Sequence, residues 1–200
     1  MKILVLHLSL LFLSFSINAK QVFLGPSNNS QEEIQEALID LEPGDILTLK
    51  PGEYFFEDGL SLDIDDVIFE GSGIDETILN FENQMSGAQG LLVTSNGVTI
   101  RDFAVLDAKG DAIKVIGADG IKMIRLRTEW TGGPKETNGA YGFYPVESKD
   151  VLIDGCVAIG ASDAGIYVGQ SQNIIVKNSI AQYNVAGIEI ENSFYADVFD

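Results

Sequence analysis

Residues 165–184 read GIYVGQSQNIIVKNSIAQYN, and the same pattern begins again 22 residues later. The run Gly165–Val168 returns as Gly187–Ile190, and Ser171 returns as Ser193. A period in the twenties, built from short runs of strand-forming residues, is typical of a solenoid in which each repeat stacks on the one before it. We call one such repeat a rung.

Aligning this rung with the chain locates earlier copies. The rungs start at Gly90, Ala112, Gly142, Gly165 and Gly187, with steps of 22, 30, 23 and 22 residues. One rung is therefore about eight residues too long, and the excess falls at 131–139, TGGPKETNG, a loop by composition. In a repeat protein such an insertion protrudes from one face, often the binding face.

The N-terminal part of the mature chain has two further features. Ser30 followed by Glu33 matches a capping box, and apolar residues then recur at helical spacing, so the sequence predicts a short helix over 31–41 that ends at Pro43-Gly44. This helix must cover an apolar surface, and the open end of a β-solenoid is one. From Asp45 onward, runs of three to five β-formers between Gly, Asp and Asn turns predict strands.

These repeats resemble those of the right-handed parallel β-helix of the pectin lyase-like superfamily, in particular the repeats of carbohydrate-binding and sugar-hydrolysing proteins. The resemblance rests on the Gly-Ile-x-Val starts and Asn-Ile-x-Val middles of the rungs. The helix followed by Gly44–Leu49 and Pro51–Tyr54 looks like the usual entry rung. The resemblance covers about 25–200 and implies an all-β fold, but this fold supports many activities.

The first 19 residues are expected to be a secretory signal. Lys2 precedes the mostly apolar run 3–15, and Ala19 ends a cleavage-site pattern. The run is short for a membrane span, although an uncleaved N-terminal anchor is the alternative. We therefore expect a signal peptide at 1–19, a β-helix domain at 20–200, and an exported protein, periplasmic or extracellular, with no membrane association after cleavage. The chain stops partway through a rung, from which we expect the domain to continue beyond residue 200.

Composition excludes several chemistries. The only histidine, His7, lies in the expected signal, and the only cysteine is Cys156. Neither a Ser-His-Asp site nor a zinc site rich in His and Cys can be built from the mature chain. The net charge of −18 argues against nucleic acid as a partner. It also disfavours a polyanionic glycan, unless a divalent cation bridges the like charges.

Stacking the rungs in register places one outward residue of each rung in a column. The column consists of Leu92, Lys114, Tyr144, Tyr167 and Glu189, and the adjacent residue of each rung is apolar. Aromatic rings can contact sugar faces, while the charged groups can bond sugar hydroxyls. The alternative is that these residues are ordinary cross-strand pairs covered by the long loop.

Polar residues and a tryptophan lie in the turns before this column. Asp107, Asp111 and Asp163 could supply an acid, a base or ligands for a cation, although tight turns favour Asp in any case. Together with the column, these residues define the expected site. The candidate catalytic residues are Lys114, Tyr144, Asp111 and Asp163; the candidate substrate-binding residues are Trp130, Lys135, Tyr141, Tyr167 and Glu189; and the candidate ligands for Ca²⁺ are Asp107 and Asp111.

The resemblance implies three chemistries. Polyuronate lyases and epimerases of this fold use a basic residue or a tyrosine to abstract a proton, which implies Lys114 or Tyr144 here, with Ca²⁺ held by Asp107, Asp111 or Asp163. Glycoside hydrolases of the fold use clustered aspartates. The Gly-His-Gly element of polygalacturonases is absent. We expect a protein that binds and processes polysaccharide or oligosaccharide, and the alternative is a non-catalytic β-helix that binds glycan or a partner protein.

Overall fold

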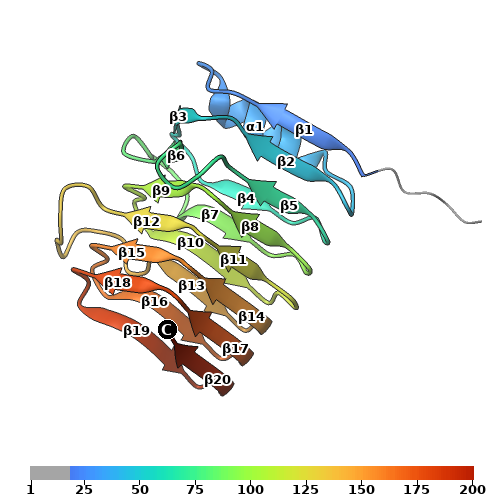
Figure 1. The fold of residues 1–200 in the computed structure, drawn as a ribbon. Coiled ribbons are helices and arrows are strands. Elements are labelled where there is room, and N and C mark those ends of the chain that lie inside the picture. The colour runs from blue at the N-terminus through green and yellow to red at the C-terminus, as the bar shows by residue number, and fades with distance from the viewer. Residues whose placement is uncertain (1–18) are drawn as a thin grey trace, which may run out of the picture.

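The computed structural model describes residues 19–200, and the predicted signal at 1–19 lies outside the described residues except for Ala19. Within the described part, no helix is both long and apolar enough to cross a membrane. Short strands follow one another almost without interruption, and one α-helix, α1 (Ser30–Ile39), lies near the N-terminal end. Figure 1 shows the strands stacked from β1 to β20, with α1 at the end where the stack begins.

The strands form three parallel sheets, and each sheet receives one strand from successive rungs. Sheet I contains β1 (Gln21–Leu24), β2 (Ile46–Leu49), β5 (Ile68–Glu70), β8 (Thr99–Arg101), β11 (Lys122–Ile124), β14 (Lys149–Asp154), β17 (Gln172–Lys177) and β20 (Phe194–Phe199). Sheet II contains β4 (Leu60–Leu62), β7 (Gln89–Val93), β10 (Asp111–Ile116), β13 (Phe143–Val146), β16 (Ala164–Gly169) and β19 (Ala186–Glu191). Sheet III contains β3 (Gly52–Phe55), β6 (Thr77–Asn80), β9 (Ala104–Leu106), β12 (Arg127–Glu129), β15 (Val157–Ile159) and β18 (Ile180–Gln182).

The predicted register of the rungs is confirmed. In sheet II, Leu91 pairs with Ile113, Ile113 with Phe143, Phe143 with Ile166, and Ile166 with Ile188. These partners are separated by the 22, 30, 23 and 22 residues expected from the repeat. The first four of them are completely buried. Successive rungs of parallel strands lie about 4.8 Å apart, so each inward side chain packs on its equivalents above and below.

Each rung has three strands, whereas the sequence pattern predicts two. The strands missed are those of sheet III from β9 onward, which are only three residues long. One of them, β12, reads Arg-Thr-Glu and has no apolar alternation. It forms a strand because its backbone pairs with β9 on one side and with β15 on the other. Tertiary pairing, rather than local propensity, decides this segment.

The helix covers the N-terminal end of the stack as predicted, but its first turn differs. The helix starts at Ser30 rather than after it, and the residue before it, Asn29, makes no side-chain capping bond. The Ser30 hydroxyl instead donates to the Ser27 carbonyl, and the Ser27 hydroxyl donates to Glu33. Glu33 therefore pairs with Ser27 and not with Ser30, the serine that the capping-box pattern predicts. Buried Ile34 and Leu38 pack on the first rungs.

A serine ladder supports the turn between sheets II and I. The Ser171 hydroxyl accepts a hydrogen bond from the Ser148 backbone N–H at 3.0 Å, and the Ser193 hydroxyl accepts one from the Ser171 N–H at 3.0 Å. The Ser171 hydroxyl also donates to the Gly169 carbonyl at 2.7 Å. Each serine thus satisfies backbone groups at a corner where the strand ladder is interrupted. This explains why Ser171 recurs as Ser193 in the sequence.

Two buried threonines differ in hydrogen bonding and give a matched test. The Thr128 hydroxyl, in β12, is buried and has no partner among the described residues. The Thr77 hydroxyl accepts from the Ser72 N–H at 2.9 Å and lies within 3.3 Å of the Lys50 carbonyl. A buried, unpaired polar group costs about 1–3 kcal/mol, whereas a paired one stabilises the fold.

We therefore expect Thr128→Val to raise the free energy of unfolding by about 1 kcal/mol and Thr77→Val to lower it by about 1 kcal/mol or more. Chemical unfolding followed by circular dichroism measures both. A Thr128→Val protein that is less stable than the wild type by as much as Thr77→Val would contradict the assignment.

Candidate functional site

The outward column predicted on sheet II is present. On β10, Lys114 pairs with Leu92 of β7 on one side and with Tyr144 of β13 on the other. On β16, Tyr167 pairs with Glu189 of β19. Their inward neighbours fill the core, so the strand geometry places these four polar side chains on the outer surface of the stack. All four are partly exposed.

Three tyrosines meet on this surface. The ring centroid of Tyr141, which lies just before β13, is 4.6 Å from that of Tyr144 and 4.7 Å from that of Tyr167. The rings of Tyr144 and Tyr167 are 5.3 Å apart and almost perpendicular. These are favourable aromatic geometries, so the cluster is preorganised. We call Lys114 and these three tyrosines the tyrosine face.

The strand ladder is interrupted beneath this cluster. Between β13 and β16 the pairing is seen at Phe143 with Ile166 and at Val146 with Gly169. Pro145 lies between these positions, and proline has no N–H to donate. The interruption coincides with the residues that carry the Tyr144 and Tyr167 rings.

The Lys114 ammonium is held between a ring and a carboxylate. Its nitrogen lies 4.5 Å from the centroid of the Tyr144 ring and 3.6 Å from Asp111. The two charged side chains are only 20% and 14% exposed, respectively. Burial raises the pKa of the Asp111 carboxyl, and the lysine charge opposes this shift in part. The face therefore contains a carboxyl group that retains its proton to a higher pH than usual.

All three phenols hold their protons more tightly than a free tyrosine. Burial raises the pKa of Tyr141 to about 12, and the carboxylate of Asp163 beside it adds to the shift. A hydrogen bond from the Tyr167 hydroxyl to Glu191, 2.9 Å long, raises the pKa of Tyr167 to about 12. Burial and the charge of Asp111 raise the pKa of Tyr144. At neutral pH the three phenols are hydrogen-bond donors rather than bases.

Seven of the nine predicted catalytic and binding residues thus lie at or beside the tyrosine face: Lys114, Tyr141, Tyr144, Tyr167, Asp111, Asp163 and Glu189. Glu189 lies beside Tyr167 in the same register. Glu191 is a member of the site that the sequence analysis missed. The signal was available, because Glu191 lies two residues after Glu189 on the same strand and therefore on the same side of the sheet.

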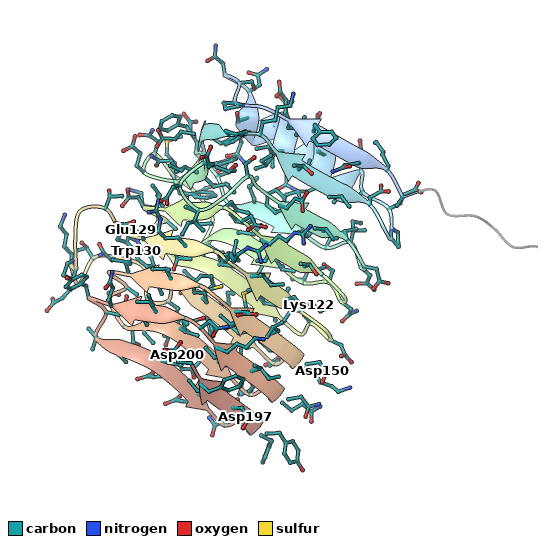
Figure 2. The ribbon with its side chains drawn as sticks, in the orientation of Figure 1. Lys122, Glu129, Trp130, Asp150, Asp197 and Asp200 are labelled. Carbon is teal, nitrogen blue, oxygen red and sulfur yellow. The ribbon has the colours of Figure 1, made fainter. Side chains whose placement is uncertain are left out.

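Trp130 does not lie on this face. Its side chain is 4% exposed and packs in the core, and its indole N–H donates to the Ala108 carbonyl at 2.8 Å. The expectation that Trp130 contacts a ligand is therefore not supported: the ring anchors the start of the insertion. Figure 2 shows Trp130 beside Glu129, where the chain leaves β12 for the long loop.

The insertion 131–139 is a loop, as predicted, and follows the neighbouring rung. The Asn138 side chain donates to the carbonyls of Gly133 and Gly160. Lys135 is exposed and lines a separate cavity of about 220 Å³ with Tyr183 and Asn184. The structure therefore does not bring Lys135 together with the tyrosine face.

The two expected calcium ligands, Asp107 and Asp111, each contact a neighbouring side chain or backbone group. Both carboxylate oxygens of Asp107 accept hydrogen bonds from Thr131, one from its N–H at 2.8 Å and one from its hydroxyl at 2.6 Å. Asp111 faces Lys114. Across residues 19–200, no group of three or more His, Cys, Asp or Glu side chains is arranged to hold a metal ion. The donor set does not fit the six to eight oxygen ligands of Ca²⁺.

The stacked parallel sheets and their register define a β-helix, and comparison with protein families agrees. The family described as "Right handed beta helix region" matches residues 65–199, and the chain belongs to this family. A search of curated proteins gives no match.

Solved structures with the same fold act on polysaccharides. The catalytic domain of a GH87 alpha-1,3-glucanase, in complex with tetrasaccharides, aligns with 82% of this chain at 17% identity and a TM-score of 0.68. An alginate lyase from Paenibacillus sp. strain FPU-7 aligns with 88% of the chain at 17% identity and a TM-score of 0.60. A PL6 family alginate lyase aligns with 88% at 13% identity and a TM-score of 0.55. The alignments cover 30%, 66% and 29% of those proteins, so this chain spans less than two thirds of each. Likeness at this identity establishes the pectin lyase-like fold alone.

The single tryptophan of the chain permits a direct test of the position of Trp130. We expect blue-shifted emission, poor quenching by acrylamide, and no change in either when a saccharide binds at the tyrosine face. A fluorescence titration measures this, with free N-acetyltryptophanamide as the exposed reference. Emission that shifts on saturation with a saccharide would restore Trp130 as a ligand contact.

Proposed function

We propose that the tyrosine face binds polysaccharide and that the chain belongs to a polysaccharide-processing protein. The observation that carries this proposal is the cluster of Tyr141, Tyr144 and Tyr167, preorganised on the outside of a β-helix beside Lys114. Aromatic rings supply flat apolar area for sugar rings, and phenol, ammonium and carboxylate groups bond hydroxyls. The glucanase and lyases that share the fold support a function of this class.

Among the candidate chemistries, the charges favour a hydrolase over a lyase or an epimerase that uses Tyr144 as its base. Abstraction of a proton by Tyr144 requires its phenolate, and the raised pKa of Tyr144 disfavours that form. Protonation of a glycosidic oxygen requires a neutral carboxyl, and burial raises the pKa of Asp111 toward that role. We assign Asp111 as the proton donor of the catalytic version of this proposal, with Asp163 as the second carboxylate of the face.

The second candidate is a non-catalytic β-helix that binds glycan. It is favoured by the same phenols, which remain protonated and serve as donors without acting as bases. Both candidates use the same face and differ only in turnover. Export rests on the pattern of residues 1–19 and is part of the proposal for either candidate.

Replacement of two tyrosines tests the face. We expect Tyr144→Ala with Tyr167→Ala to weaken glycan binding by about tenfold or more, since each ring contributes about 0.5–1.5 kcal/mol beyond its buried area. Isothermal titration against soluble glycans measures the affinity. The matched control is Tyr183→Ala with Tyr195→Ala, which removes two exposed tyrosines from other surfaces. Equal affinities of the two double variants would refute the proposed face.

Turnover separates the two candidates. Incubation with neutral glycans and polyuronates is followed by new reducing ends and by the ultraviolet absorbance of unsaturated products. The hydrolase version predicts reducing ends without unsaturated products, a rate that falls as pH rises through the Asp111 pKa, and a loss of about a hundredfold in Asp111→Asn. Retained binding without turnover on this panel would leave the non-catalytic candidate.

A further inference from the structure

Carboxylates surround the tyrosine face, and the cation Lys114 lies among them. Tyr167 donates a hydrogen bond to Glu191 at 2.9 Å and pairs with Glu189 across the strands. Asp163 lies beside Tyr141, and Asp111 lies close to Tyr144. Each ring of the cluster therefore has at least one carboxylate next to it.

The charge of Lys114 is smaller than the summed charge of the carboxylates around the rings. Lys114 lies 3.6 Å from Asp111, and both side chains are mostly buried. Lys114 contributes one positive charge against the three carboxylates Asp163, Glu189 and Glu191, so the surface around the rings has a net negative charge whether Asp111 is protonated or ionised. The whole chain, at −18, adds a field of the same sign.

A uronate residue carries a carboxylate of its own at neutral pH. Bound against these rings, it would be within several ångströms of Asp163, Glu189 or Glu191, and these three carboxylates outnumber the one lysine of the face. Two like charges at such a distance near a protein surface lower an affinity by about tenfold or more. A bridging metal ion would relieve the repulsion, but residues 19–200 contain no built metal site.

An uncharged sugar is not repelled by these carboxylates and can form hydrogen bonds with them. Its hydroxyl groups are hydrogen-bond donors, and ionised carboxylates act only as acceptors, so Glu189 and Glu191 match them. Hydrogen bonds to a charged acceptor are stronger than those between neutral groups. The tyrosine rings contribute the same apolar contact to a neutral sugar as to an acidic one.

We propose that the tyrosine face selects uncharged oligosaccharides and excludes polyuronates by the charge of Asp163, Glu189 and Glu191. This inference rests on the proposed function, because it assigns the substrate class of the same face. It would separate this chain from the two alginate lyases that share its fold.

The test compares affinities for neutral and acidic oligosaccharides of equal length. The probes are linear oligosaccharides of glucan, mannan and xylan on one side and oligogalacturonate and oligoalginate on the other, each at low and high salt and with and without Ca²⁺. We expect at least one neutral probe to bind at least tenfold more tightly than either acidic probe at low salt, with a smaller ratio at high salt because screening weakens the repulsion.

A charge-neutralised variant identifies the cause. We expect Glu189→Gln with Glu191→Gln to reduce the neutral-to-acidic affinity ratio at least threefold. The matched control, Glu32→Gln with Glu36→Gln, removes the same charge from two exposed positions of α1 and should change the ratio much less.

The outcomes are distinguishable. Tighter binding of an acidic probe by the wild type, or equal ratios in the variant and its control, would overturn the selectivity while leaving glycan binding at this face intact. Binding of neither class of probe would refute the proposed function itself, and this inference with it. Acidic probes that bind tightly only with Ca²⁺ would show that a recruited cation overrides the carboxylates, and would also overturn the inference.

Discussion

The in-register parallel pairing of each rung with the next is the constraint on which the rest of the structure depends. It converts a position in the repeat into a column in space, so one residue type repeated every 22 or 23 residues becomes a continuous row. Inward columns must be apolar, since they pack on themselves at the spacing of paired strands. The columns at the corners must satisfy backbone groups, as the row Ser148, Ser171 and Ser193 does.

The same constraint limits the size of the side chain at positions where the backbones of neighbouring rungs come close together. A side chain at Gly142 would place its Cβ 2.5 Å from the Gly165 carbonyl oxygen and 2.5 Å from the Thr128 hydroxyl. Glycine therefore occupies position 142 because the neighbouring rung and the Thr128 side chain both crowd it. One rung departs from the regular length, and its insertion begins directly after Trp130, whose buried indole donates a hydrogen bond to Ala108 of the rung before it.

The function-bearing surface follows from the columns. Lys114, Tyr144, Tyr167 and Glu189 are distant in sequence but occupy equivalent outward positions on four strands of sheet II. Tyr141 joins them from the end of the insertion. The three rings already contact one another in the folded chain. The conformational entropy of ordering their side chains is therefore lost on folding and not when a ligand binds.

Much of this arrangement is predictable from the repeat alone. The period determines which residues share a column, so Lys114, Tyr144, Tyr167 and Glu189 could be grouped before any coordinates. The short strands of sheet III could not be predicted from the sequence, because residues such as Arg127–Glu129 have no strand pattern and form a strand only by pairing with their neighbours. The burial of Trp130 could not be predicted either, since periodicity does not show whether a residue at the base of a loop points into the core. The hydrogen bond that the Thr131 hydroxyl donates to Asp107 is likewise a local contact that the repeat does not predict.

The most direct test of the account is the response of the six tyrosines to a bound neutral oligosaccharide, measured from assigned aromatic ring signals in an NMR titration. The account predicts that the ring signals of Tyr141, Tyr144 and Tyr167 shift together with one dissociation constant, while those of buried Tyr54 and exposed Tyr183 and Tyr195 stay in place. Shifts centred on Tyr183 or Tyr195, with the three clustered rings unaffected, would contradict it.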